Sequence, residues 1–430
     1  GGSIGAAAFA RSLGLANVIA FDMGGTTAKC TLITNGRFSV ENATYIGGFE
    51  TGFPIRAAVI DIVEIGTGGG SIAALDGQNR LSVGPRSAGA EPGPACYGKG
   101  GAEPTITDAN LILGRLDPDG FLGGELALDV AAARDAVRDS IAGPLGFDDD
   151  QGVLHMADGI VTIAVDRMAS AIRKISVERG LDPRDFALLT YGGGGPLHAS
   201  ALASALDIPL VIVPPEPGNF SATGMLLADS RVDEARTFLT ELDEAAVART
   251  RDIFGDMARA ATAQLREEAE GEVSFEYDAE MRYRGQKHSI RIAVGGFDDE
   301  AALRAAFEKE YRRRYGHADA AGTIEFVGLH LGAVMATQQP DVARLGREGA
   351  PGNVFRKSRS VCLPLDTAMT ETDIYDRESL AAGFAAEGPA IIEEYGSTTL
   401  VSKSDRFDIG SAGEIRIHCG VRQNGGGDHG

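Results

Sequence analysis

Short apolar runs alternate with amphipathic stretches over the first 235 residues of the chain. The runs with the length and composition of buried strands are 17–21, 28–33, 186–191 and 210–213. Only a turn separates the first two runs, which predicts a hairpin. Between the last two, residues 197–206 have helical spacing and follow Pro196, which suits the first position of a helix. This part of the chain therefore predicts an α/β domain with a parallel strand–helix–strand unit.

Helical spacing is clearest over residues 156–179. Apolar residues recur there every three or four positions and fall on one face. Gly180 then offers a left-handed cap, and Pro183 prevents the helix from continuing. Residues 4–13 predict a shorter helix at the start of the chain.

The pattern changes after about residue 235. The next elements predicted are a charged helix over 243–270, a hairpin over 273–294, a helix capped by Asp298, and a strand over 323–337. From residue 346 the apolar runs are short and strand-like, at 361–365, 390–394, 397–401 and 414–418. The sequence thus predicts an α/β domain over 1–235, an α+β domain over 236–345 and a β-rich domain over 346–422. Residues 423–430 are expected to be disordered.

Composition narrows the class of protein. Hydrophobic residues make up 43% of the chain, and no apolar run approaches the ~20 residues of a membrane span, so no membrane partner is expected. The formal net charge of −21 argues against nucleic acid as a partner. The four cysteines form no CxxC pair, so neither a zinc site nor a disulfide framework is expected. A reducing, cytoplasmic location fits best.

Two glycine-rich turns carry the clearest chemistry. The first follows the run 17–21 and consists of Asp22, Met23, Gly24, Gly25, Thr26 and Thr27. Its bare backbone can meet phosphate oxygens, its threonine hydroxyls can donate to them, and Asp22 can hold a hydrated Mg²⁺ ion. The alternative interpretation is a simple hairpin turn.

The second turn follows the run 186–191 and consists of Gly192, Gly193, Gly194 and Gly195. An adenine or a ribose could lie on so flat a backbone. The alternative is that these glycines only permit close packing of a strand and a helix. Taken together, the two turns predict a nucleotide clamp in which two subdomains fold toward each other and grip a triphosphate across a gap.

Other candidate residues have structural explanations beside the functional ones. Asp108 begins a helical pattern and is either a helix cap or an active-site carboxylate. His198 is expected to be an ordinary helix residue rather than a ligand, although it could reach a phosphate from the helix after the glycines. Cys96 lies in a glycine- and proline-rich segment, 66–101, which is expected to form an ordered wall; a buried, inert thiol is the interpretation that the sequence favours. The basic cluster at 282–287 is expected to be a solvated face.

Several of these motifs resemble the A subunit of the hydantoinase/oxoprolinase family. The segments that carry the resemblance are 21–26, 68–72, 83–98, 105–110, 192–198, 217–224, 283–286, 315–317 and 388–393. They extend over nearly the whole chain, and the block from 68 to 110 is the most specific.

The resemblance implies an actin-like ATPase (ribonuclease H-like) fold, as in sugar kinases. It implies an enzyme that uses ATP and Mg²⁺ to phosphorylate a small cyclic amide of the hydantoin or 5-oxoproline type for ring opening, together with a hydantoinase B/oxoprolinase-type subunit. Asp22, with Asp108 as a second candidate, is then catalytic and Asp22 also binds the metal. Gly24, Gly25, Thr26 and Thr27 fall on a phosphate loop, and the glycines 192–195 on the nucleoside turn.

Two alternatives stay open at this point. Related family members are ATP-dependent ketone carboxylases, and a non-catalytic nucleotide-binding protein of actin-like fold would show similar turns. Members of the family begin with a further domain that carries a first phosphate loop. This chain is therefore expected to be a piece that lacks the N-terminal domain and that binds ATP poorly by itself.

Overall fold

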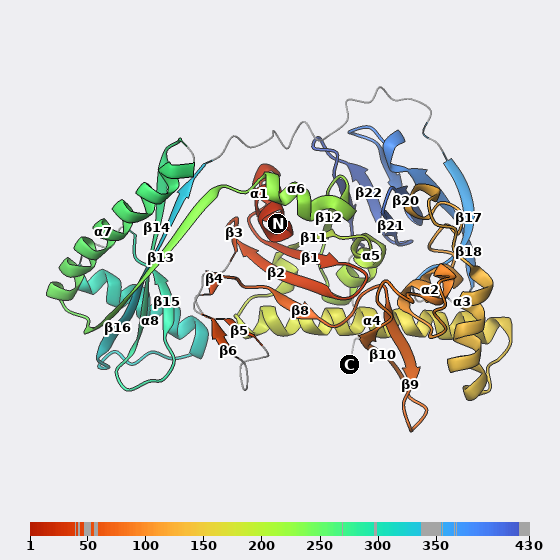
Figure 1. The fold of residues 1–430 in the computed structure, drawn as a ribbon, viewed down its shortest axis with the longest axis horizontal. Coiled ribbons are helices and arrows are strands. Elements are labelled where there is room, and N and C mark those ends of the chain that lie inside the picture. Colours follow the sequence, from red (N-terminus) through yellow and green to blue (C-terminus); the bar gives the residue numbers. More distant parts are fainter. Residues whose placement is uncertain are drawn as a thin grey trace, which may run out of the picture. The chain divides into compact units, whose positions relative to one another are not determined.

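The computed structural model describes residues 1–38, 40–41, 44–46, 53–55, 59–268, 270–295, 299–336, 354, 356–364, 366 and 368–420. The chain forms two compact units (Figure 1). The first comprises residues Gly1–Leu226 and Pro340–Gly430, and the second comprises Leu227–Gln339. The predicted disordered tail, 423–430, lies outside the described residues.

A mixed sheet forms the centre of the first unit, in the order β19-β22-β23-β12-β11-β1-β2-β3, with β8 also paired to β2. The strands that matter most for the site are β1 (Val18–Met23), β2 (Ala28–Thr34), β11 (Ala187–Tyr191) and β12 (Leu210–Val213). Strands β1 and β2 pair antiparallel, which confirms the predicted hairpin. Strand β11 is parallel to both β1 and β12, as the strand–helix–strand prediction requires.

The predicted helices of the first unit are present with shifted ends. They are α1 (Gly2–Ser12), α4 (Asp150–Glu178) and α5 (Gly195–Leu206). Helix α4 begins six residues before the predicted Met156, because the side chain of Asp149 accepts a hydrogen bond from Gly152 N at 2.7 Å and caps the helix. It ends where Gly180 takes a positive φ of 67°. Its buried face packs into the same core as the central sheet.

The C-terminal strands belong to the first unit, whereas the sequence predicts a separate β-rich domain. Strand β23 (Ile415–His418) pairs antiparallel with β12 and extends the central sheet through β22 (Arg406–Ile409) and β19 (Ala385–Glu387). A four-stranded sheet forms beside it from β17 (Arg356–Cys362), β18 (Met369–Asp376), β20 (Ala390–Glu394) and β21 (Ser397–Val401). Both sheets share one hydrophobic core with α4 and α5.

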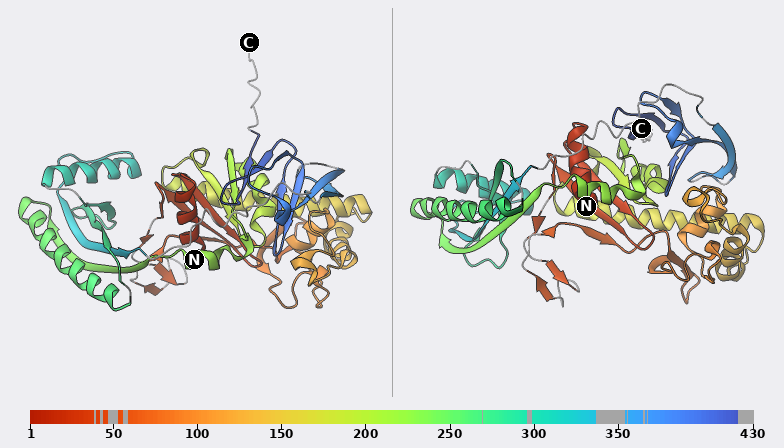
Figure 2. Two further views of the ribbon diagram at one scale, coloured as in Figure 1. Left: turned by 90° about the horizontal axis from the view of Figure 1, so that it is seen from above. Right: turned by 45° about the horizontal axis from the view of Figure 1, so that its top comes forward.

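The second unit is the predicted α+β arrangement. Its sheet has the order β13-β16-β14-β15, from β13 (Ser230–Glu241), β16 (Ile324–Met335), β14 (Val273–Tyr283) and β15 (Ile290–Ala293). Helices α7 (Glu244–Glu268) and α8 (Glu300–Tyr315) pack on it, and Figure 2 shows them from two further sides. The cap of α8 is Asp299, which accepts from Ala302 N at 2.7 Å; the predicted cap, Asp298, lies outside the described residues.

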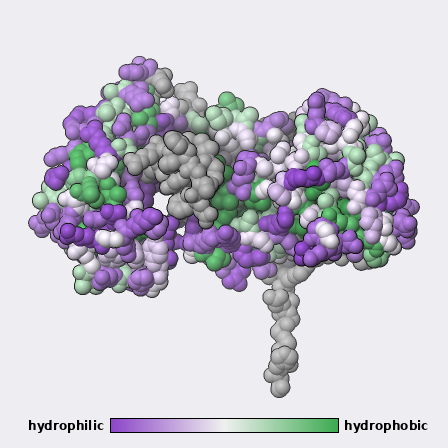
Figure 3. All heavy atoms as spheres, turned by 60° about the horizontal axis from the view of Figure 1, so that its bottom comes forward, coloured by the Kyte–Doolittle hydropathy of each residue, from purple (hydrophilic) through white to green (hydrophobic). Residues whose placement is uncertain are grey.

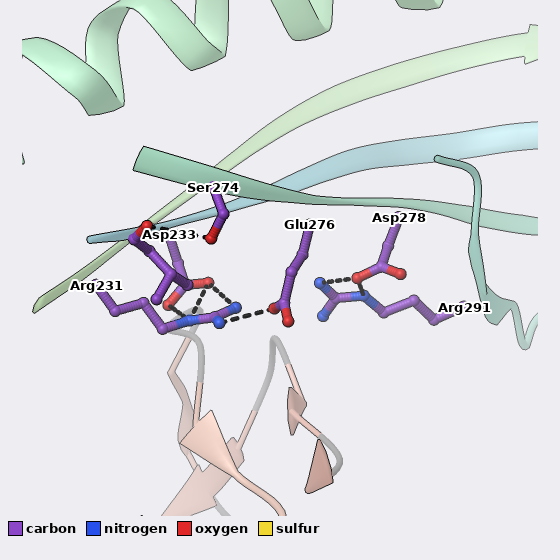
Figure 4. Close-up of polar contacts among 7 residues, drawn as sticks. Arg231, Asp233, Ser274, Glu276, Asp278 and Arg291 are labelled. Carbon is purple, nitrogen blue, oxygen red and sulfur yellow. Dashed lines mark hydrogen bonds and ion pairs between the residues drawn. The ribbon is translucent and has the colours of Figure 1, made fainter. Parts of the chain in front are cut away.

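Charged side chains occupy the other face of this sheet (Figure 4). Alternate residues of β14 enter the core, and the residues between them point to the opposite side. There Arg231 pairs with Asp233 and with Glu276 at 2.7 Å, and Arg291 pairs with Asp278 at 2.7 Å. Because these side chains are partly exposed, solvent screens the pairs, and they contribute little to stability.

Most of the face seen in Figure 3 is hydrophilic, with hydrophobic residues gathered in small patches. None of the helices in the described part of the chain combines the length and the apolar composition that a bilayer crossing requires.

Candidate functional site

The two glycine-rich turns leave the same edge of one sheet. Strands β1 and β11 are parallel neighbours in which Asp22 is paired with Tyr191, so both chains emerge side by side. The N–H of Gly194 donates to Met23 O at 2.9 Å and joins the turns directly. The prediction that two subdomains bring these turns together across a gap is therefore wrong. One sheet edge carries both.

Gly192 makes this close approach possible. A Cβ atom at Gly192 would lie 2.5 Å from Asp22 Oδ1 and 2.5 Å from Met23 O. These distances are too short for any residue with a side chain. The residue also has a positive φ of 79°, which favours glycine. Thr190 lies on β11, and its Oγ1 is buried without a hydrogen-bond partner among the described residues. This oxygen is 2.7 Å from where a Cβ of Gly195, the first residue of α5, would lie.

The turn after β1 presents bare backbone to open space. Gly24 N–H donates to Thr27 O at 3.2 Å and closes the turn. A Cβ at Gly25 would meet nothing within 4 Å, and Gly25 and Thr26 are exposed. Lys29 Nζ donates to Thr27 Oγ1 at 2.7 Å and brings a positive charge beside the turn. Exposed N–H and hydroxyl groups next to a lysine suit a phosphate.

Asp22 lies at the root of this turn and is partly buried. Burial raises the pKa of its carboxyl above the ordinary value, and Lys29 and the hydroxyl of Ser221 oppose that shift. Ser221 Oγ lies 3.5 Å from Asp22 Oδ2, a weak contact at most. A cation close to Asp22 would favour the ionised form of its carboxyl and lower its pKa.

A third glycine-rich segment supports the same turn. Gly69 N–H donates to Gly24 O at 3.0 Å, and Gly70 N–H donates to Gly25 O at 2.6 Å. A Cβ at Gly68 would lie 2.5 Å from the backbone of Thr26, so only glycine fits there. This segment begins the predicted wall, which the structure shows to contain a hairpin of β9 (Ser71–Leu75) and β10 (Leu81–Ser87). The sequence predicted an ordered wall but not its contact with the turn.

Asp108 is a buried acceptor that organises the segment around helix α2 (Ile106–Ile112). Its carboxylate accepts from Cys96 N at 2.7 Å, Ala95 N at 3.2 Å, Thr105 N at 2.8 Å and Thr105 Oγ1 at 2.7 Å. The side chain is 0% exposed. Thr105 is the N-cap of α2, and Asp108 completes the capping box by accepting from Thr105 N–H, so the helix-cap interpretation accounts for the contacts with Thr105. The contacts with Ala95 and Cys96 tie the segment before the helix to it. A catalytic role of Asp108 stays a prediction that this geometry does not support.

We expect Asp108→Ala to lower the free energy of unfolding by about 2–3 kcal/mol, because it leaves several buried N–H and O–H groups without an acceptor. Asp129→Ala is the matched control. Asp129 also caps a helix, through Ala132 N at 2.9 Å, but is exposed, so its loss is expected to cost about 1 kcal/mol. Urea denaturation measures both. Equal effects of the two substitutions would contradict the importance assigned to Asp108.

Two other candidates lie inside the core. His198 is 2% exposed, and burial lowers its pKa to about 3, with a smaller contribution from the charge of Arg115. The ring is therefore neutral, and the suggested reach of His198 to a phosphate is not supported. Cys96 is 0% exposed, and burial raises the pKa of its thiol far above the ordinary value, which agrees with an inert thiol. All four cysteines are free.

Comparisons with known proteins identify the family. The family model "Hydantoinase/oxoprolinase" matches residues 1–234, and "Hydantoinase/oxoprolinase C-terminal domain" matches residues 239–409. An uncharacterised protein of Methanocaldococcus jannaschii is 38% identical over 97% of this chain and 60% of its own length. The caprolactamase subunit alpha of Pseudomonas jessenii is 35% identical over 93% of this chain and 58% of its own length. The acetophenone carboxylase gamma subunit of Aromatoleum aromaticum is 32% identical over 96% of this chain and 58% of its own length.

A solved structure agrees with these sequence matches. The crystal structure of the ATP-dependent caprolactamase from Pseudomonas jessenii superposes with a TM-score of 0.83 and 32% identity, over 97% of this chain and 61% of that one. The chain thus spans about 60% of the length of the relatives it matches. Its glycine-rich turns lie within the first matched region and strands β17 to β22 within the second, whereas β23 lies beyond the second. The chain belongs to the hydantoinase/oxoprolinase family.

Proposed function

We propose that this chain is the nucleotide-binding part of an ATP-dependent enzyme that activates a cyclic amide for ring opening. The observation that carries the proposal is the meeting of two bare-backbone turns, 24–27 and 192–195, at one sheet edge beside Asp22. The hairpin and the parallel strands behind them are consistent with an actin-like ATPase fold, which we propose for the first unit. Support also comes from the P. jessenii caprolactamase, which is described as an ATP-dependent enzyme.

The two turns would divide the nucleotide between them. The exposed turn Gly24–Thr27 with Lys29 suits the phosphates, and the turn Gly192–Gly195 at the start of α5 suits the nucleoside. Mg²⁺ prefers oxygen ligands and keeps several waters, so a single carboxylate can hold it. Asp22 is the residue that fits this task, because its partly buried carboxylate has only a weak contact with Ser221.

Phosphorylation is the chemistry that such a site would supply. An amide carbonyl is a poor electrophile, because its nitrogen donates electrons into it. Transfer of a phosphoryl group to the carbonyl oxygen breaks the bond to the ADP leaving group and makes the carbon open to attack by water. Backbone N–H groups, Lys29 and a metal held by Asp22 would neutralise the negative charge that develops during transfer.

A ketone carboxylase is the second candidate, because the acetophenone carboxylase gamma subunit is 32% identical over 96% of this chain. The same phosphate chemistry would then activate a ketone or bicarbonate. In either case we expect two further parts to complete the enzyme. One corresponds to the part of the relatives that this chain does not cover, and the other is a partner subunit of the hydantoinase B/oxoprolinase type. Subunit names such as caprolactamase alpha support a partner.

A substrate screen tests the proposal. The complete subunit, mixed with its partner, is incubated with ATP and Mg²⁺, and phosphate release is measured with hydantoin, 5-oxoproline, caprolactam or acetone plus bicarbonate. Release that depends on a cyclic amide is expected. Release that depends on acetone and bicarbonate would favour the carboxylase. ATP binding without any substrate-dependent release would instead indicate a non-catalytic nucleotide-binding protein.

A further inference from the structure

A turn from the C-terminal sheet lies directly on the proposed nucleoside turn. It joins β20 to β21 and contains Tyr395 and Gly396, of which Gly396 has a positive φ of 76°. A Cβ at Gly193 would lie 3.1 Å from Gly396 O, and a Cβ at Gly218 would lie equally close to the same atom. Ser397 Oγ lies 3.5 Å from Gly193 O. Three segments that are distant in sequence therefore meet here, through their backbones and the hydroxyl of Ser397.

Tyr395 directly precedes Gly396 in this turn. The residue is 52% exposed. Its ring lies against the backbone of Gly123, where a Cβ would be 2.8 Å from Tyr395 Cδ2. Gly123 has a positive φ of 65°, so a glycine there both fits the backbone and leaves room for the ring. The backbone of Gly123 thus supports the ring, while much of the residue is open to solvent.

Buried polar groups next to the same turn lack partners. Glu394 Oε1 and one terminal nitrogen of Arg377 are buried without a hydrogen bond to any described residue. Burial raises the pKa of Glu394 to about 7, opposed by the charge of Arg377 and reinforced by Glu216. Glu216, whose charge acts on Glu394, directly precedes Pro217 and Gly218. An unpaired buried polar atom is costly, so these two groups are incompletely satisfied next to the turn.

We propose that the β20–β21 turn, residues 394–397, forms the base end of the nucleotide site, and that the ring of Tyr395 stacks on a purine base. This inference rests on the proposed function, because it takes turns 24–27 and 192–195 as the nucleotide site. An aromatic plane beside bare backbone binds a flat, uncharged ring well. The carboxylate of Glu394 would repel phosphates, which places them at the other end, near Lys29.

The test separates the base from the phosphates. Binding of ATP and of inorganic tripolyphosphate to the complete subunit is measured by calorimetry, for the parent protein and for Tyr395→Ala. Loss of one stacked base contact is expected to weaken ATP binding about tenfold, since such stacking contributes roughly 1–3 kcal/mol. Binding of tripolyphosphate is expected to be unchanged, because it has no base to stack.

Three further variants define the result. Tyr395→Phe keeps the ring and should bind ATP as the parent does. Tyr315→Ala removes another exposed tyrosine, on α8 of the second unit, and should change nothing. Glu394→Gln keeps the size of the side chain but removes the charge proposed to repel phosphates, and should bind tripolyphosphate at least as tightly as the parent does. Melting temperatures without ligand show whether each variant folds.

The outcomes distinguish this inference from the function on which it rests. If the parent binds neither ATP nor tripolyphosphate, the proposed nucleotide site is itself wrong. If the parent binds both and Tyr395→Ala binds ATP with parental affinity, the nucleotide site stands and the role of the β20–β21 turn is overturned. Equal weakening of ATP and tripolyphosphate in a folded Tyr395→Ala protein would also overturn it, because a base contact cannot affect tripolyphosphate.

Discussion

Asp22→Ala in the complete enzyme is expected to reduce ATP-dependent turnover by roughly a thousandfold or more. The reason is that the carboxylate at the root of the phosphate turn is the group proposed to hold Mg²⁺, and loss of a preorganised charge at a phosphoryl-transfer site has effects of this size. Steady-state phosphate release at saturating ATP measures it. Asp22→Asn, which keeps the shape but loses the charge, should fail almost as completely.

Stability is expected to survive this substitution. In the metal-free protein, burial raises the pKa of Asp22, so the folded state binds the proton more tightly than the unfolded state. Ionisation of Asp22 therefore lowers the stability of the folded state as pH rises from the ordinary value through the raised one. Removing the carboxylate removes this penalty at neutral pH. Asp252→Ala, at an exposed position on α7, is the control for turnover. Parental turnover by Asp22→Ala would exclude Asp22 from the mechanism.

Arg115→Ala is expected to lower the free energy of unfolding by about 3–5 kcal/mol, the usual effect of removing one partner of a buried ion pair. Arg115 is 1% exposed. Its Nη2 lies 3.3 Å from Asp158 Oδ1, and its Nε donates to Cys362 O at 2.9 Å. Truncation would leave both oxygens without this donor. Because Cys362 ends β17, the substitution also loosens the C-terminal sheet from α2, which precedes Arg115.

Two variants separate the ion pair from simple loss of volume. The double substitution Arg115→Met with Asp158→Leu removes both charges and is expected to be much less destabilising than Arg115→Ala alone. Arg80→Ala breaks an exposed pair with Asp76 and should change stability by less than about 1 kcal/mol. Chemical denaturation measures all three. If Arg115→Ala is as mild as Arg80→Ala, the buried pair does not stabilise the first unit.

Local patterns predicted the elements of this fold well. The β1–β2 hairpin and the β11–α5–β12 unit follow from short apolar runs, Pro196 and glycine turns, all of which act within a few residues. The start of α4 was missed because its first turn is polar, and the cap by Asp149 fixes it instead. Strands β18 and β22 were not predicted, because each contains few apolar residues. Pairing with neighbouring strands of a sheet stabilises them instead.

Pairing between strands that are distant in sequence could not be predicted. The pairing of β12 with β23 joins residues about two hundred positions apart, and no local pattern reports it. For the same reason the sequence separated the C-terminal strands into their own domain and did not place Gly396 beside Gly193. The two glycine turns were recognised, but the prediction that they face each other across a gap was wrong. The order of strands in the sheet decides which turns are neighbours, and the sequence does not reveal that order.

The sheet order also has a consequence for synthesis on the ribosome. Residues 227–339 are contiguous and form one unit, whereas the other unit is assembled from both sides of that insertion. The insertion can therefore complete its fold as soon as it leaves the exit tunnel. Its host must wait for residues 415–418 to pair with β12. Until residues 415–418 have been synthesised, one side of β12 stays without its neighbour, an exposed strand edge to which chaperones could bind.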